Sequence, residues 1–200
     1  MKRALFGIVA VATAFVVGRI SAQSVAAASC AACDAAYISS EELAVYEDIA
    51  AATGITDQQV RSLDIGKVNV QIALVRRGRL EAPAPRSVAE HDLVTEVYYV
   101  LSGSGTNMTG PDLVDAEPRP ADNRAVRFLN GPGHNAAGIR GGVEQELQAG
   151  DVLVIPAGTG HQFTRIDDHI TYLMVRVDPD KVVPLMDEGA SRRYLDEAAR

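Results

Sequence analysis

The chain has 200 residues, of which 47% are hydrophobic and 22% are charged. This composition is typical of a soluble globular protein, and it excludes a disordered tail, a collagen-like repeat and a protein with many membrane spans. The formal net charge is -7, and residues 1–22 contain no acidic residue. Without that stretch, 16 basic and 26 acidic residues remain, a net charge of about -10. Because phosphate backbones repel such an acidic body, we expect no nucleic-acid partner.

Residues 1–22 have the pattern of a secretory signal peptide. Lys2 and Arg3 precede an apolar run that extends from residue 4 to residue 18, and small residues follow Arg19. The run is shorter than the roughly 18–20 residues that span a bilayer. We therefore predict cleavage and a periplasmic or secreted protein. The alternative is an uncleaved N-terminal anchor that leaves the protein attached to the membrane and facing the periplasm, with no other membrane contact.

Cys30 and Cys33 lie in an Ala/Ser-rich stretch over residues 23–38, which we interpret as a tether. Three interpretations of this Cys-x-x-Cys remain open. A redox dithiol usually begins a helix that follows a strand, and no strand is predicted before it. A lipid-modified Cys30 would be preceded by a larger aliphatic residue than Ala27. The third interpretation is a pair of cysteines that bond to each other in an oxidising compartment.

Helices are predicted near both ends of the mature chain. Ser39 and Glu42 have the spacing of a capping box, and apolar residues with helical spacing follow over residues 40–52, up to Gly54. Residues 191–200 are predicted to form a short exposed helix. The expected plan of the chain is a signal segment (1–22), a tether (23–38), a helical extension (39–59), a β-barrel (60–178) and a tail with a short helix (179–200).

From residue 68 onwards the hydrophobic pattern has a period of two, which is typical of a half-buried strand. We expect Arg76-Arg77-Gly78 to end this strand and residues 110–123 to form a surface loop. Before the strand that starts at residue 68, residues 56–59 suit the start of a short helix, whereas residues 60–64 also suit a strand. Further short strands are predicted at 95–101, 105–109, 124–129, 136–140, 143–148, 151–155, 161–166 and 169–177. Many short strands separated by turn residues predict an all-β sandwich or barrel.

Residues 91–103 contain the first group of side chains that could bind a metal. Glu96, Tyr98 and Val100 share one face of a predicted strand, and His91 lies one short turn before it. A carboxylate and an imidazole are therefore expected at the beginning of this strand.

Residues 150–161 contain a second candidate. Pro156 ends a five-residue strand because it cannot donate to the ladder, and Gly158 and Gly160 permit a positive φ in the turn that follows. His161 then begins the next strand, where its side chain can enter the mouth of a barrel. Two imidazoles and one carboxylate would supply three ligands and leave positions open for water, substrate or oxygen.

These two segments resemble the paired motifs of the cupin superfamily. The matching residues are His91, Glu96 and Gly103 in H-x4-E-x6-G, and Gly150, Pro156, Gly158 and His161 in G-x5-P-x-G-x2-H. The chain departs from the family pattern at Ala89, where most metal cupins have a histidine, and at Arg165, where the second motif has Asn. The resemblance covers roughly residues 60–178.

The resemblance implies a single antiparallel jelly-roll-like β-barrel, often dimeric, with a metal held by His91, Glu96 and His161. A fourth ligand would be a water molecule or His134. The Glu-x-Tyr spacing at Tyr98 also occurs in cupin-type dimethylsulfoniopropionate lyases, where a tyrosine can serve as base. Tyr98 is therefore the candidate catalytic residue.

Two other features are interpreted as incidental. His169 is expected in an exposed turn. Asn107-Met108-Thr109 matches the glycosylation sequon but falls within a predicted strand.

We therefore predict an exported, metal-dependent cupin enzyme of the oxygenase, lyase or isomerase type that acts on a small molecule. The metal would be Fe(II), Mn(II), Ni(II) or Zn(II), because two neutral donors and one carboxylate suit such ions. The alternative is a non-catalytic module that binds a small molecule with weak or no metal, and Ala89 favours it. A homodimer is the expected assembly.

Overall fold

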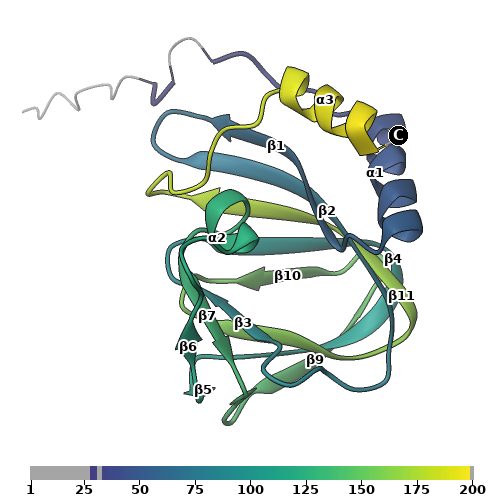
Figure 1. Ribbon diagram of the computed structural model, residues 1–200, viewed down its shortest axis with the longest axis vertical. Helices are drawn as coiled ribbons and strands as arrows, with labels where there is room; N and C mark the ends of the chain where they lie inside the picture. Colours follow the sequence, from purple (N-terminus) through teal and green to yellow (C-terminus); the bar gives the residue numbers. More distant parts are fainter. Residues whose placement is uncertain (1–27, 31–32, 199–200) are drawn as a thin grey trace, which may run out of the picture.

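The structure is a computed structural model that describes residues 28–30 and 33–198 (Figure 1). Antiparallel β-sheet makes up most of it, and two helices lie side by side outside strands β1 and β2. The predicted signal peptide lies outside the described residues. Among the residues that are described, no helix is long and apolar enough to cross a membrane.

Helix α1 (Ser40–Thr53) begins and ends where the sequence predicts. The Ser39 hydroxyl accepts a hydrogen bond from the Glu42 backbone N–H at 3.1 Å, which satisfies one of the free donors of the first turn. Gly54 ends the helix in the left-handed region, with a φ of 73°, and its N–H donates to the Ala50 carbonyl.

Helix α3 (Glu188–Ala198) begins three residues before the predicted position and packs against α1. The rings of Tyr46 and Tyr194 are stacked with their centroids 5.7 Å apart. Below them, Val60 and Leu74 close a small apolar cluster that is separate from the main core. The two helices therefore cover the outer face of β1 and β2.

The strands, in chain order, are β1 (Asp57–Asp64), β2 (Asn69–Leu80), β3 (Val88–His91), β4 (Thr95–Gly110), β5 (Leu113–Val114), β6 (Glu117–Pro118), β7 (Gly133–Ala136), β8 (Gly138–Ile139), β9 (Val143–Gln148), β10 (Val152–Ile155) and β11 (Gly160–Asp178). One sheet runs in the order β1-β2-β11-β3-β7-β6, and β4 pairs with β9, β10 and β11. The predicted all-β class is confirmed. The pairs found among the described residues do not close into a ring.

Strands β2 and β11 are longer than the sequence predicts. We expected Arg76-Arg77-Gly78 to end the first strand, and this is wrong because β11 pairs with these residues, from Thr171↔Arg76 to His169↔Gly78. The predicted strands at 161–166 and 169–177 are likewise a single strand, with an irregularity in the ladder between Ile166 and His169.

Strand β4 joins the predicted strands at 95–101 and 105–109. Gly103 permits this because its φ is 71°, and a Cβ at this position would lie 1.9 Å from the His169 carbonyl oxygen. The alternation of buried side chains shifts around this residue, so that Glu96, Tyr98 and Val100 face inward before it and Asn107 after it.

The prediction of a strand at 124–129 is wrong. Residues Arg124–Phe128 form the short helix α2, because the side chain of Asn123 caps it by accepting from the Ala125 N–H at 2.8 Å. The predicted loop over 110–123 contains the two-residue strands β5 and β6, and residues 57–59 begin β1 instead of a helix.

Cys30 and Cys33 are joined by a disulfide, with 5.6 Å between their Cα atoms. No strand of the described residues precedes them. The pairing agrees with the third interpretation of the Cys-x-x-Cys.

The main core lies on the inner face of the sheet. It is rich in aromatic and aliphatic side chains from β2, β4 and β11, and its buried members are Ala73, Val75, Tyr98, Val100, Leu147, Ile155, Phe163, Ile166, Ile170, Tyr172 and Met174. Because β4 and β11 supply most of these residues, the same two strands also position the polar side chains at one end of the core.

Candidate metal centre

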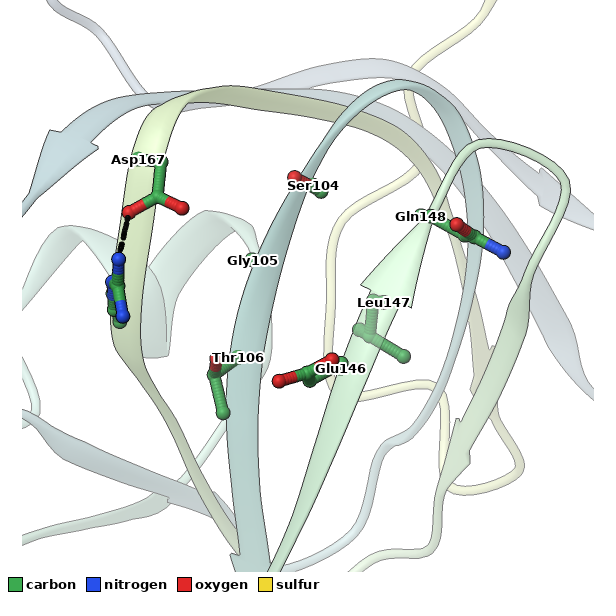
Figure 2. Close-up of a pocket in the computed structure, with 8 residues that line it drawn as sticks. Ser104, Gly105, Thr106, Glu146, Leu147, Gln148 and Asp167 are labelled. Atoms are coloured by element: carbon green, nitrogen blue, oxygen red, sulfur yellow. Dashed lines mark hydrogen bonds and ion pairs between the residues drawn. The ribbon is translucent and has the colours of Figure 1, made fainter.

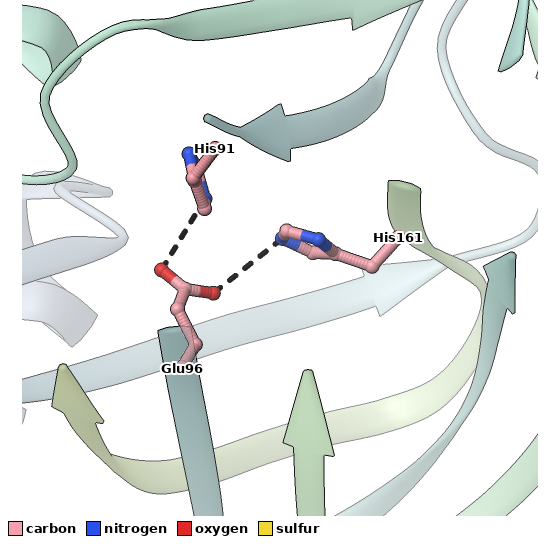
Figure 3. Close-up of side chains that lie close together, drawn as sticks. All are labelled: His91, Glu96 and His161. Carbon is pink, nitrogen blue, oxygen red and sulfur yellow. Dashed lines mark ion pairs between the residues drawn. The ribbon is translucent and has the colours of Figure 1, made fainter. Parts of the chain in front are cut away.

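The three predicted ligands meet at one end of the core (Figure 3). His91 is the last residue of β3, Glu96 is the second of β4 and His161 is the second of β11. Strand β11 pairs with β4 along most of its length and with β3 at His161↔Ala89. This pairing brings together residues that are up to 70 positions apart in the sequence.

The distances between these side chains suit a shared ion. His91 Nε2 lies 3.3 Å from Glu96 Oε1, and His161 Nε2 lies 3.5 Å from Glu96 Oε2. All three donor atoms lie within 4.8 Å of one another, and none of the residues is more than 7% exposed. The group could hold a metal ion, since two imidazoles and a carboxylate are a common donor set for divalent transition metals.

The turn after β10 positions both histidines. Gly158, with a φ of 79°, donates its N–H to the His91 carbonyl at 2.8 Å. The Ala157 N–H donates to the Thr95 hydroxyl at 3.2 Å. The second motif is therefore fixed by hydrogen bonds to His91 and Thr95 of the first motif.

His161 has the protonation state that a ligand needs. Its Nδ1 lies 3.2 Å from the Thr159 carbonyl oxygen, so Nδ1 carries a proton and Nε2 presents its lone pair to the site. Burial lowers the pKa of His161 to about 4. The ring is therefore neutral at pH 7.

Glu96 is held as a carboxylate by several donors. Burial raises its pKa, but His91, Arg176 and His161 outweigh this effect and hold the pKa well below its usual value. Asn130 Nδ2 donates to Oε1 at 2.6 Å and Arg176 Nε at 3.2 Å. Arg176 is fully buried and also pairs with Asp57. The charge of Glu96 is thus balanced within the protein.

His91 differs from His161 in its tautomer. Arg119 Nη1 lies 3.2 Å from His91 Nδ1, and a guanidinium can only donate. Nδ1 must therefore accept, which leaves the proton on Nε2, directed at Glu96. Glu96 and His161 fit a metal as they stand, and His91 fits once the proton moves from Nε2 and the contact with Arg119 is given up.

No side chain that could bind a metal lies at the position where the family pattern has a fourth ligand. Ala89 lies directly opposite His161 in the ladder and presents only a methyl group. His134 does not replace it, because its Nδ1 lies 2.8 Å from Glu90 and 3.2 Å from Asp92 in a separate group. An ion held by these three ligands would therefore keep at least one position open for water or substrate.

Tyr98 lies beside the three candidate ligands. Its hydroxyl donates to Glu96 Oε2 at 2.9 Å, and its ring stacks on Tyr172 with 4.3 Å between the centroids. Burial and the charge of Glu96 raise the pKa of Tyr98 well above its usual value. The phenol therefore keeps its proton at neutral pH and is not available as a base in this state. Its catalytic role stays a prediction.

A cavity of about 210 Å³ adjoins this group. His161, Tyr98 and Ala89 line its inner end, and Arg77, Asn107 and Phe163 are among the residues of its other walls. A hollow of about 370 Å³ on the outside, between β4, β9 and β11, contains none of the predicted site residues (Figure 2). Arg165, which replaces the motif asparagine, lies there and pairs with Asp167 at 2.7 Å.

Sequence reasoning missed Arg119, Asn130 and Arg176. Only Arg176 has a local signal, because it continues the buried face of Tyr172 and Met174 along an apolar strand. A cation at such a position needs a buried partner, and Glu96 lies directly opposite it in the ladder.

No family model and no curated protein matches the sequence. Similar solved structures include a protein from Bacillus halodurans, at 13% identity, with 80% of this chain and 95% of that chain covered and a TM-score of 0.40. A cupin protein from Bacteroides fragilis is 19% identical, with coverage of 58% and 72% and a TM-score of 0.33. The DMSP lyase DddQ from Ruegeria pomeroyi DSS-3 is 14% identical, with coverage of 68% and 53% and a TM-score of 0.38.

Likenesses as distant as these carry no information about activity. The fold rests instead on the antiparallel strand pairing and on the meeting of the two motifs at one end of the core. The described residues therefore form an antiparallel β-fold that brings the two motifs together, as the sequence predicts.

Proposed function

We propose that the protein is an exported, metal-dependent cupin enzyme that acts on a small molecule. The observation that supports this most is the convergence of two imidazoles and an ionised carboxylate beside a cavity of about 210 Å³. Perturbed, buried titratable groups that adjoin a cavity are typical of active sites.

A divalent ion held by His91, Glu96 and His161 would supply Lewis-acid or redox chemistry. The other residues prepare the site. Asn130 and Arg176 fix the Glu96 carboxylate by donating hydrogen bonds to it. Tyr98 lines the cavity and orients Glu96 through the hydrogen bond that its hydroxyl donates to Oε2. These features suit lyase, isomerase or oxygenase chemistry.

Metal analysis tests the proposal. We expect about one transition-metal ion per chain in the purified protein and a loss of most of it in both His161→Ala and His91→Ala, because each removes one of three ligands. His169→Ala is the matched control, since His169 bonds to Asp168 and Ser102 away from the site. Sub-stoichiometric metal that the two ligand variants leave unchanged would refute the metal centre.

The alternative function is a non-catalytic module that binds a small molecule without metal. Arg119 and Arg176 favour it, because they already satisfy His91 and Glu96 with protein hydrogen bonds. Chelator-treated protein that binds its ligand as tightly as untreated protein would support this alternative.

We also propose that a second copy of the chain covers the outer face of β4 and β10. Tyr99, Leu101, Val152 and Val154 expose between 39% and 59% of their surface there. Among the described strands β10 pairs only with β4, so its other edge is open.

Sedimentation tests this assembly. We expect twice the mass of one chain for the wild type and a shift to monomer for Val152→Glu/Val154→Glu, because charges on this face oppose its burial. The control is Val143→Glu, an equally exposed apolar residue on β9. A monomeric wild type would exclude the dimer.

A further inference from the structure

Asn107 is a buried polar side chain without a protein partner. It is 0% exposed, and neither its Nδ2 nor its Oδ1 forms a hydrogen bond with any described residue. Leaving a buried amide unpaired is unfavourable, and such groups are rare in native proteins. Because Asn107 lines the cavity beside His161, a bound molecule could supply the missing partners.

A second amide lies next to it. Gln145 on β9 is directly opposite Asn107 in the ladder, and its Oε1 is also buried without a protein partner. The inner face of this part of the sheet therefore holds three unpaired amide atoms, which include both a donor and acceptors.

Arg77 supplies a positive charge at the mouth of the same cavity. Its guanidinium lies 5.4 Å from the centre of the Phe163 ring, and its Nε donates to the Tyr172 hydroxyl at 3.2 Å. No carboxylate of the described residues pairs with it, and it is the only cavity-lining residue with a permanent charge. An unpaired arginine in a protein of net charge -7 is a suitable partner for an anion.

Phe163 connects the two groups. Arg77 lies over its ring, and its backbone pairs with that of Asn107. A molecule that contacts both side chains also reaches Tyr98 and His161 at the inner end of the cavity. The volume of about 210 Å³ equals roughly seven water molecules of liquid, which suits a compact acid.

We infer that this cavity binds a small organic hydroxy acid. Its carboxylate pairs with the guanidinium of Arg77, and its hydroxyl exchanges hydrogen bonds with the amide of Asn107. As the substrate class of the proposed enzyme, this inference rests on the proposed function. The remaining carbon atoms lie toward His161.

Calorimetric titration tests the inference with lactate, 3-hydroxypropionate and 3-hydroxybutyrate, each compared with its amide. We expect at least one acid to bind with a Kd below about 1 mM and its amide to bind at least about tenfold more weakly, because the amide lacks the charge that Arg77 recognises. Arg77→Gln and Asn107→Leu should each weaken binding of the acid by about tenfold or more. Arg79→Gln is the control, because Arg79 is exposed on the same strand and pairs with Glu81.

Thermal unfolding separates a ligand-binding role of Asn107 from a structural one. Because Leu has no polar group to leave unpaired, ligand-free Asn107→Leu should melt higher than the wild type by roughly 2–4 °C. A structural role predicts a lower melting temperature instead. Because Arg77 is exposed, Arg77→Gln should fold. Its binding result therefore stands even if Asn107→Leu does not fold.

Two outcomes overturn the inference: no acid binds more tightly than its amide, or the Arg77 and Asn107 variants bind the acid as the wild type does. Metal content, measured on the same samples, distinguishes this failure from that of the proposed function. Acid binding without metal refutes the metalloenzyme and retains the hydroxy-acid site. Stoichiometric metal without acid binding refutes the hydroxy-acid site and leaves the proposed metalloenzyme standing.

Discussion

Replacing Arg176 with Met is expected to lower the free energy of unfolding by about 3–5 kcal/mol, because it leaves Glu96 as an uncompensated buried charge. Arg176 is fully buried; it pairs with Glu96 and Asp57 and donates to Gln59 at 3.0 Å. Urea denaturation measures the change.

The double variant Arg176→Met/Glu96→Gln tests the cause. Gln keeps the shape of Glu96 without its charge, so the double variant should be more stable than Arg176→Met alone. Arg165→Met, which breaks an exposed pair with Asp167, should change stability little. A double variant no more stable than Arg176→Met would mean that lost packing, and not the unpaired carboxylate, causes the effect.

Replacing Arg119 with Gln is expected to tighten metal binding by about tenfold or more, the size of effect seen when groups behind metal ligands change. The guanidinium holds His91 in the tautomer with its proton on Nε2, and its charge repels a cation. Bonds to Asn135 and to the His134 carbonyl, at 2.5 and 2.8 Å, keep it in place. A Gln side chain can accept from Nδ1 instead, which frees the Nε2 lone pair.

Titration with Co(II), followed by its visible absorption, measures this affinity. Arg119→Lys is the matched control, because an ammonium also only donates and keeps the charge. Its affinity should therefore stay near that of the wild type. Weaker binding in Arg119→Gln would show that Arg119 positions His91 for the metal, the reverse of the expected role.

The features that were predicted correctly depend on neighbouring residues. Ser39 and Glu42 form their cap within four residues, and Gly158 has the predicted positive φ. Gly160 does not, because it already belongs to the extended strand β11. The two motifs brought together His91, Glu96 and His161 because each fixes a histidine at one end of a strand.

The features that were missed depend on pairing between distant segments. The partner of Arg176 lies 80 residues away, and only the register of β4 with β11 places it opposite Glu96. The same pairing carries β2 through Arg76-Arg77-Gly78, which local turn preference predicts as an end. At Asn107 the sequence showed a glycosylation sequon but could not predict that the side chain is buried. Its burial depends on pairing with Phe163 and Gln145 in neighbouring strands.

The length of β11 has a consequence for folding. Its first residues carry His161, its middle forms the core with β2 and β4, and its end carries Arg176. Its pairs with β2 reach from Ile166↔Leu80 to Asp178↔Asn69, so segments 86 to 109 residues apart must meet before they form. Such long-range closure is slow compared with local structure formation. The ligands, the cavity and the counter-charge of Glu96 should therefore assemble together, in one late step.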